Sequence, residues 1–260
     1  MPSKTELRAQ AILRAVRESG TVGGEDLAEL LQVSIATVRR DLQELEGRGL
    51  LRRTRGGASA IEPLFYEPFR HDSSFQEQVD RNADEKRRIG QAAADMVEHG
   101  DVIAVTPGTT ATQVIRNLGS QEGVTVVTST VNVAMELSGR KNLEVFLTGG
   151  YLRGHWFSLV GAAAVSGARR VFPDKMFIGV NGLDAGKGLT SLSEAEAEVI
   201  AVMMKQSRLR ILVADHSKLG AVATHFIAPA EEAHLLITDR GAKEEQLAPL
   251  RALGMEVRLV

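Results

Sequence analysis

The chain has 260 residues, which is enough for two domains, and its 31 lysines and arginines against 33 acidic residues leave a formal net charge of −2. It contains no cysteine, which excludes disulfides and thiolate metal sites and is compatible with a reducing cytoplasm. No apolar signal segment is apparent, no apolar run approaches the roughly 18 residues of a membrane span, and the six histidines lack metal-site spacing. We therefore expect a cytoplasmic protein that has no membrane partner and binds neither metal nor cofactor.

Three short helices are predicted near the N-terminus, because apolar residues recur there at helical spacing. The second helix is expected over residues 25–31 and the third over residues 35–46, with a tight turn between them. Ser34 stands where the N-cap of the third helix belongs, and its hydroxyl can accept a hydrogen bond from a free N–H of the first turn. The apolar stripe of the first helix consists of Ala9, Ile12, Leu13 and Val16.

The third helix is amphipathic, and a basic segment follows it. Thr37 and Arg40 point away from its apolar stripe, with Arg39 on the flank. Residues 50–57 have the sequence Leu-Leu-Arg-Arg-Thr-Arg-Gly-Gly, which suits a short strand that turns at paired glycines. Helix, turn, exposed polar helix and basic wing together predict a winged helix-turn-helix. The apolar stripe of the third helix consists of Ile35, Val38, Leu42 and Leu45.

Two interpretations fit these residues: a helical bundle with a solvated arginine-rich surface, or a DNA-binding module. The distribution of charge favours DNA, since residues 34–57 hold six arginines against three acids while residues 61–260 hold 21 bases against 25 acids. Arginines of the third helix suit base edges and phosphates in the major groove, and those of the wing suit the DNA backbone or the minor groove. The predicted DNA-binding residues are Ser34, Thr37, Arg39, Arg40, Arg52, Arg53 and Arg55.

The helical periodicity lapses over residues 61–82, and we predict a linker there between a DNA-binding domain over residues 1–60 and a second domain over residues 83–260. Pro63 and Pro68 discourage a continuous helix in this segment. Flexible linkers are poor in aromatic residues, whereas several aromatic side chains are interleaved with charges here. We therefore expect the segment to pack on a domain or on a partner subunit.

From residue 83 onward, helical patterns alternate with short β-branched strands. Crossover helices between strands imply a mostly parallel sheet that is covered on both faces, so the predicted fold class is α/β. Helices are expected over residues 85–98, 111–118, 131–137, 194–205 and 243–253. Strands are expected over residues 102–105, 124–127, 144–147, 176–180, 210–214, 235–238 and 256–260.

Ligands of such sheets bind at the carboxyl ends of the strands, where four loops of this chain carry suitable chemistry. One of them ends in Gly-Thr-Thr, which can hold a phosphate through the glycine backbone, hydroxyl groups and free helix N–H groups. The alternative for each loop is structural: a turn, a helix cap or a solvated charge. Convergence of the four loops would favour a phosphorylated, polyhydroxylated effector. The predicted effector-binding residues are Gly108, Thr109, Thr110, Gly149, Gly150, Arg153, Asp184 and Lys218.

Nearly the full length of the chain resembles the DeoR family of transcriptional regulators. The resemblance rests on two sets of positions, which are residues 33–34, 37–42, 45–46, 49–50 and 55–58 in the N-terminal part and residues 100–101, 108–110, 148–150, 177–179, 182, 214–215 and 217–218 in the C-terminal part. It implies a sensor domain that is related in fold to ribose-5-phosphate isomerase and binds a sugar phosphate. It also implies repression of a sugar-catabolic operon, which this effector relieves.

Three positions depart from the pattern of that family. Thr106 stands where the family usually has an acid, Ser129 begins the pair that is frequently Asn-Ser, and Ile200 stands where a lysine is usual. These changes remove one carboxylate and one amine from the site region and leave the fold untouched, so the identity of the effector stays open. Trp156, in the loop beside Arg153, is either an aromatic wall of the site or a core residue.

The predicted function is therefore a ligand-responsive repressor, whose partners are operator DNA, a phosphorylated sugar and further copies of the chain in a homodimer or homotetramer. The alternative is a sugar-phosphate isomerase, whose carboxylate base would be Asp184 or one of three alternating glutamates. These glutamates lie near a helix start, where acids are favoured in any case, so we expect no enzyme and no catalytic residue. An activator of the same architecture also fits the sequence. The three glutamates are Glu194, Glu196 and Glu198.

Overall fold

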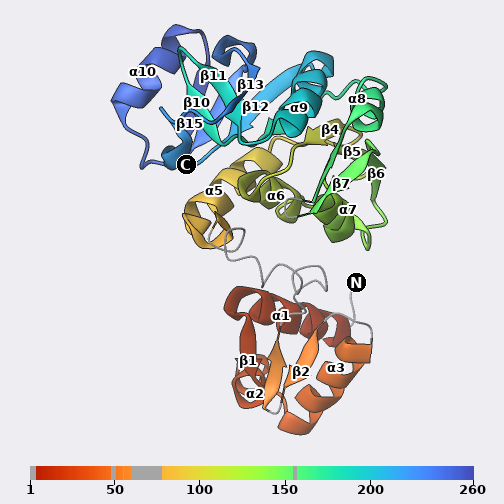
Figure 1. Ribbon diagram of the computed structural model, residues 1–260. Coiled ribbons are helices and arrows are strands. Elements are labelled where there is room, and N and C mark those ends of the chain that lie inside the picture. Colours follow the sequence, from red (N-terminus) through yellow and green to blue (C-terminus); the bar gives the residue numbers. More distant parts are fainter. Residues whose placement is uncertain (1–3, 48–50, 55, 60–77, 155–156) are drawn as a thin grey trace. The chain divides into compact units, whose positions relative to one another are not determined.

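The computed structural model describes residues 4–47, 51–54, 56–59, 78–154 and 157–260 (Figure 1). The chain divides into two compact units, Met1–Pro68 and Phe69–Val260. The aromatic residues of the predicted linker lie outside the described residues, and so do Arg55 and Trp156. Among the described helices, none combines the length and the apolar character that a membrane span requires.

The first unit contains three helices and a small antiparallel sheet, which confirms the predicted winged helix-turn-helix. Its elements are α1 (Lys4–Ser19), α2 (Gly24–Leu31), α3 (Ile35–Gly47), β1 (Thr21–Gly23), β2 (Arg52–Thr54) and β3 (Gly57–Ser59). Strand β3 lies between β1 and β2, so the wing is part of a three-stranded sheet rather than one turning strand. The sequence pattern does not reveal β1, because three residues are too few to show an alternation.

The core of this unit joins all three helices. Ile12, Leu27 and Leu45 come from α1, α2 and α3, and all three side chains are buried. At Gly57 the sheet closes tightly, since a Cβ there would lie 1.9 Å from the carbonyl oxygen of Val22 on β1. Only glycine fits this approach, and it fixes the wing against the rest of the unit.

A parallel sheet of seven strands forms the centre of the second unit (Figure 1). Its strands are β4 (Val102–Val105), β5 (Val124–Thr128), β6 (Leu143–Leu147), β9 (Lys175–Ile178), β12 (Leu209–Val213), β14 (Leu235–Thr238) and β15 (Glu256–Leu259). They lie in the order β15-β14-β12-β9-β4-β5-β6, and every neighbouring pair is parallel. The predicted α/β class is confirmed, and each predicted strand is found within two residues of its expected bounds.

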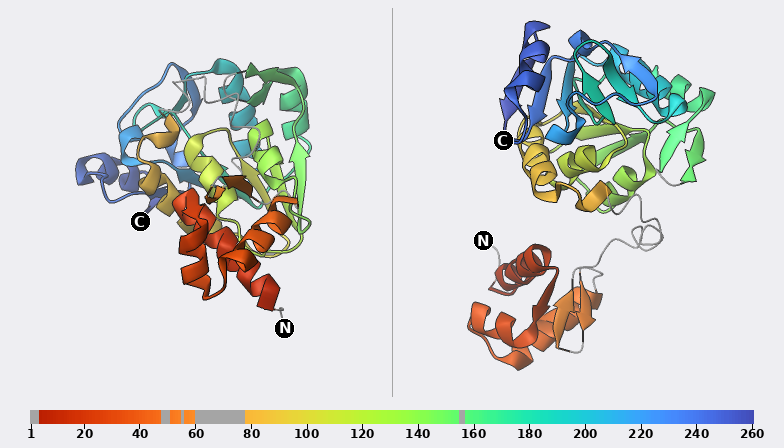
Figure 2. Two further views of the ribbon diagram at one scale, coloured as in Figure 1. Left: turned by 90° about the horizontal axis from the view of Figure 1, so that it is seen from below. Right: turned by 60° about the vertical axis from the view of Figure 1, so that its left-hand side comes forward.

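Helices cover both faces of this sheet (Figures 1 and 2). They are α5 (Ala83–Ala94), α6 (Thr109–Arg116), α7 (Val131–Leu137), α8 (Ala162–Ala168), α9 (Glu194–Gln206) and α10 (Glu244–Ala252). Successive strand side chains point to opposite faces. Phe177 therefore joins the core beneath α5, α6 and α7, whereas Met176 and Ile178 join the core beneath α8, α9 and α10.

Several short elements are absent from the sequence prediction. They are α8 and the strands β7 (Tyr151–Arg153), β8 (Ser158–Val160), β10 (Gly182–Asp184), β11 (Gly188–Ser191) and β13 (His225–Ala228). The strands β7 and β8 form one hairpin, and β10, β11 and β13 form an antiparallel sheet. Strands of three or four residues carry almost no periodic signal, and α8 is made of small residues without an apolar stripe. Helix α5 also ends at Ala94, four residues before its predicted end.

The order of the parallel strands reverses between β4 and β9. From β4 the chain moves to β5 and β6 on one side, and from β9 it moves to β12, β14 and β15 on the other. At such a switch point, connections leave the carboxyl ends of adjacent strands in opposite directions and open a crevice between them. The loops after Val105 and Ile178 border this crevice.

Candidate functional site

The exposed face of α3 begins at a capped N-terminus. The backbone N–H of Thr37 donates to the Ser34 hydroxyl at 3.2 Å, which confirms Ser34 as the N-cap. The two hydroxyl oxygens, Ser34 Oγ and Thr37 Oγ1, are themselves 2.9 Å apart. The capped turn therefore presents two hydroxyl groups next to the arginines of the helix.

Four of the predicted arginines lie on the surface of the first unit. Arg39 and Arg40 are exposed on α3, and Arg52 and Arg53 are exposed on β2. The backbone N–H of Arg53 donates to Glu46 Oε1 at 2.9 Å, which ties the wing to the end of α3. The exposed arginines thus lie on two elements that this hydrogen bond joins, and arginine side chains suit the phosphates and base edges of a duplex.

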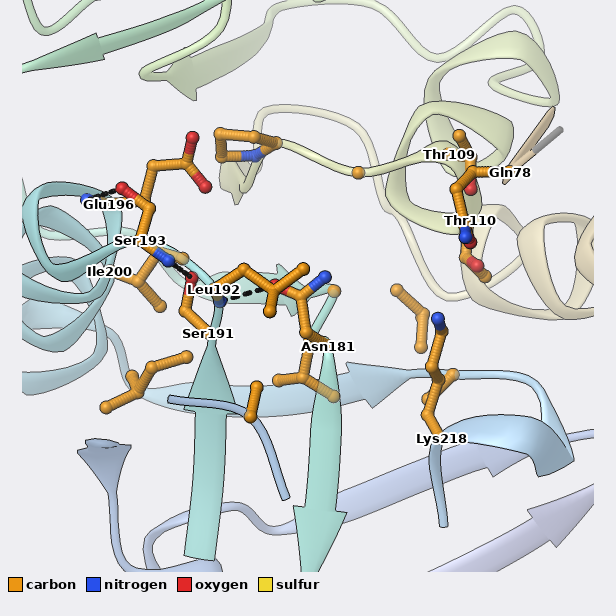
Figure 3. A pocket seen from close by; sticks show the side chains of 18 of the residues that line it. Gln78, Thr109, Thr110, Asn181, Ser191, Leu192, Ser193, Glu196, Ile200 and Lys218 are labelled. Carbon is orange, nitrogen blue, oxygen red and sulfur yellow. Dashed lines mark hydrogen bonds between the residues drawn. The ribbon is translucent and has the colours of Figure 1, made fainter. Parts of the chain in front are cut away.

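A cavity of about 470 Å³ lies in the second unit at the switch point of the sheet. Its volume is within the range of small-molecule sites. Its walls come from the loops after β4 and β9, the loop that leads into α9, and η3 (His216–Lys218), a short 3₁₀ helix after β12 (Figure 3). Five of the eight predicted effector-binding residues line it, and these are Gly108, Thr109, Thr110, Arg153 and Lys218.

One side of the cavity presents groups that can bind an anion. Helix α6 begins there after Gly108, whose φ of 138° only glycine adopts readily, and no described side chain caps its N-terminus. The free N–H groups of the first turn and the hydroxyls of Thr109 and Thr110 are available to a ligand. Lys218 reaches the same cavity from η3 and supplies a positive charge (Figure 3).

The opposite side carries a carboxylate. Glu196 lies in the first turn of α9, where its N–H donates to the capping hydroxyl of Ser193 at 3.3 Å. Its Oε1 accepts a hydrogen bond from the Ser158 hydroxyl at 2.6 Å and lies 3.6 Å from Nη1 of Arg153. The hairpin of β7 and β8 is therefore joined to the cavity through Glu196.

The other three predicted effector-binding residues lie outside the cavity lining. Asp184 Oδ1 accepts hydrogen bonds from the N–H groups of Gly186 and Lys187, each at 2.9 Å, and so stabilises the turn after β10. Gly149 and Gly150 follow the edge strand β6, away from the switch point. The structure therefore shows a local structural role for Asp184, and the contact of all three residues with an effector stays a prediction.

The structure shows what surrounds each of the three positions that depart from the family pattern. Thr106 is fully buried, and its hydroxyl accepts a hydrogen bond from the N–H of Gly179 at 2.9 Å, which joins the ends of β4 and β9. Ser129 is buried at the end of β5, where its carbonyl accepts a hydrogen bond from the N–H of Leu159. Ile200 lines the cavity, so an apolar wall stands where the family usually has an amine.

Sequence reasoning missed several lining residues, among them Gln78, Asn181 and Ser191. Asn181 Oδ1 accepts a hydrogen bond from the N–H of Leu192 at 3.1 Å and so fixes the loop before α9. Asn181 follows β9 at the switch point and could have been found from the strand order. Gln78 could not, because it lies in the predicted linker, far in sequence from the strand ends.

The carboxylates considered as catalytic bases do not converge. Glu196 lines the cavity, whereas Glu194 and Glu198 are exposed and Asp184 stabilises a turn. Among these four described carboxylates, Glu196 alone reaches the ligand space, and it is engaged by Arg153 and Ser158. These four carboxylates therefore do not form a cluster of acid–base groups at the cavity.

A winged helix-turn-helix followed by an α/β unit with a ligand cavity defines a DNA-binding regulator. The family model described as "DeoR-like helix-turn-helix domain" matches residues 8–63, and the one described as "DeoR C terminal sensor domain" matches residues 81–240. The chain belongs to the DeoR family of transcriptional regulators. The family prediction is thereby confirmed, and the protein is a regulator rather than an enzyme.

Relatives of known identity are similar over almost the whole chain. The transcriptional regulator GlpR of Haloferax volcanii is 36% identical over 250 residues, which cover 96% of each chain. The transcriptional repressor GlcR of Bacillus subtilis is 34% identical over 235 residues, which cover 90% of this chain and 88% of GlcR. Among solved structures, ribose 5-phosphate isomerase A of Methanocaldococcus jannaschii matches 53% of this chain and 54% of its own, with 17% identity and a TM-score of 0.40.

Proposed function

We propose that this regulator represses a sugar-catabolic operon and leaves its operator when a phosphorylated sugar occupies the cavity. The observation that carries the proposal is the presence of an uncapped helix N-terminus at Gly108 and of the ammonium group of Lys218 on the same side of one cavity. Backbone N–H groups and a lysine together form a site for a phosphate dianion. The name of GlcR as a repressor supports the sign of the regulation.

The remainder of the cavity suits the carbohydrate part of the effector. Ser191, Ser193 and Glu196 line the side opposite α6 and can exchange hydrogen bonds with sugar hydroxyls (Figure 3). Ile200 closes this side with an apolar surface. A lysine at this position, as is usual in the family, would bind a second anionic group of the ligand, and the isoleucine does not. The fitting ligand carries its phosphate at one end and neutral hydroxyls at the other.

The first unit supplies the contacts to operator DNA. Thr37, Arg39 and Arg40 enter the major groove, and Arg52, Arg53 and Arg55 contact phosphates or the minor groove, so that binding weakens steeply with salt. One such module contacts only a short half-site of DNA, so the protein binds repeated sites as a homodimer or larger homo-oligomer. It acts in the cytoplasm. The effector favours an arrangement of the modules that no longer matches the spacing of the half-sites.

Fluorescence anisotropy on labelled DNA from upstream of the operon of this protein tests the proposal. We expect tight, salt-sensitive binding that one compound of a sugar-phosphate panel reverses. In Lys218→Ala the effector loses a charged partner, and the concentration needed for release rises by roughly ten- to a hundredfold while operator affinity is kept. Lys205→Ala, which removes an exposed lysine at the end of α9, is the matched control.

Two results would contradict the proposal. If no sugar phosphate alters operator binding, the proposal of a phosphorylated effector is wrong, while the assignment of the first unit to DNA binding stands. An unchanged response in Lys218→Ala would remove the phosphate from the side of the cavity formed by α6 and η3.

A further inference from the structure

The residues directly before α5 are held by a buried lysine. Lys86, on α5, is 3% exposed and donates from Nζ to the carbonyl oxygen of Arg81 at 2.6 Å and to that of Gln78. Burial lowers the pKa of Lys86, and the negative charge of Asp215 partly offsets this. A buried ammonium group needs such partners, so the lysine fixes the backbone of residues 78–82, hereafter the junction segment.

The junction segment is also tied to η3. Asn82 Nδ2 donates to Asp215 Oδ1 at 2.9 Å, across 133 positions of sequence. The same oxygen accepts from the N–H and the hydroxyl of Ser217. Burial alone raises the pKa of Asp215, but the hydrogen bonds from Ser217 and Asn82 and the charge of Lys86 outweigh it and hold this pKa below its ordinary value. The carboxylate is therefore charged at neutral pH.

Both parts of this arrangement reach the ligand cavity. Gln78, at the start of the junction segment, lines the cavity together with Lys218, the last residue of η3. Figure 3 shows Gln78 on the same side as Thr109 and Thr110, opposite Glu196. The anion-binding side of the cavity is thus completed by a residue whose backbone Lys86 holds.

We propose that Gln78 contacts the phosphate group of the effector, and that Lys86, Asn82 and Asp215 position the junction segment so that occupancy of the cavity acts on the chain leading to the DNA-binding unit. The inference rests on the proposed function, since it takes the effector to be phosphorylated. Lys86 is a positioning residue, because it touches the junction segment and does not line the cavity.

The coupling follows from the connections of the segment. A phosphate held by α6 and Lys218 adds a hydrogen-bond partner for Gln78, and the free energy of that contact stabilises one conformation of the junction segment over others. This segment lies between the first unit and α5 in the sequence, so a change in its order is a change at the end of the chain that leads to the DNA-binding module. The coupling is lost when the segment is released from α5 and η3.

Amide hydrogen exchange on the full chain, with inorganic phosphate as the probe, tests the inference. Bound phosphate is expected to slow exchange of residues 78–86 in the wild type by about fivefold or more, with little change elsewhere in α5. Lys86→Met removes the donor that holds both carbonyls, so phosphate still binds but this protection is lost. Lys175→Met is the matched control, because Lys175 donates to Asp101 at 2.6 Å at the amino end of β9, whereas the cavity lies at the carboxyl ends of the strands.

A second variant keeps the test independent of the buried lysine. Gln78→Ala removes a side chain at the cavity and none from the core, and it is expected to weaken phosphate binding by roughly three- to tenfold in calorimetry. The control is Gln121→Ala, which removes a donor to the carbonyl oxygen of Val97 near the amino end of β5. This variant is expected to leave phosphate binding unchanged.

The outcomes separate the inference from the function on which it rests. Phosphate binding without protection of residues 78–86 in the wild type, or equal protection in Lys86→Met, would overturn the inference and keep the phosphate site. Phosphate affinity unchanged in Gln78→Ala would remove Gln78 from the site. A wild type that binds neither phosphate nor any sugar phosphate would defeat the proposed function, and the inference with it.

Discussion

The DNA-binding surface and the ligand cavity are built in different ways. On the first unit, Thr37, Arg39 and Arg40 are neighbours on a single helix, and their placement outside its apolar stripe follows from helical spacing alone. In the cavity, Gly108 and Lys218 are more than one hundred positions apart, and only the order of the parallel strands brings them together. The first surface depends on local structure, and the second depends on the topology of the whole sheet.

This difference decides how each site responds to change. An arginine on α3 can be replaced without disturbing the core, because its side chain is exposed. A cavity residue rests on a strand end or a helix start that is itself packed in the sheet. A substitution can therefore perturb one unit and leave the other intact.

Substitutions in the two cores are expected to have the largest effects and to act on different units. Leu45→Ala should destabilise the first unit by about 2–5 kcal/mol and Phe177→Ala the second by about 3–5 kcal/mol, since each removes a buried side chain and leaves a cavity. Differential scanning calorimetry should show each variant shifting one transition and leaving the other in place. Leu30→Ala, at an exposed position of α2, is the control; a shift of both transitions by one core variant would contradict separate units.

Loss of a recognition arginine should be the next largest effect. Arg40→Ala is expected to weaken operator binding by about 1–3 kcal/mol, because a charged contact to a base edge or phosphate is removed. Anisotropy should show effector affinity unchanged, and Arg14→Ala, an exposed arginine on α1, should leave operator affinity as it is. Equal loss of operator and effector binding in Arg40→Ala would refute the division of labour between the units.

The smallest effect concerns the charge of Asp215. Its pKa is lower in the folded protein than in the unfolded chain, so the carboxylate contributes stability that is fully present above its unfolded pKa of about 4 and is lost as the pH falls through the folded value. The free energy of unfolding should therefore differ between wild type and Asp215→Asn at pH 7, and the difference should shrink below pH ~4. Urea unfolding at a series of pH values measures this difference. A difference that does not depend on pH would contradict a stabilising role for the charged carboxylate of Asp215.

The fold was predictable where elements are long and periodic. The strands β4, β5 and β12 carry apolar β-branched runs, and α3 has a clear apolar stripe. The hairpin strands β10 and β11 were not predictable from the sequence. Each has three or four residues, and they are held by pairing with each other and with β13, which is distant in sequence. Tertiary contacts, and not local propensity, determine such strands.

The cavity was predictable in part for the same reason. Thr109 and Lys218 follow strong strands, so their place at the carboxyl edge of the sheet could be inferred. Asp184 was expected there too, but an unpredicted hairpin directs its carboxylate to a turn. Gln78 was missed because nothing in a linker sequence indicates that its backbone is fastened by a lysine of the next helix.

The way in which the anion-binding side is made has a consequence for the evolution of effector choice. Its donors at the start of α6 are backbone N–H groups, which no substitution other than proline removes. The opposite wall is made of side chains such as Ile200 and Glu196, which a substitution changes directly. Under the proposed function, regulators built on this plan keep the backbone donors for the phosphate and differ in the side chains of the opposite wall that contact the sugar.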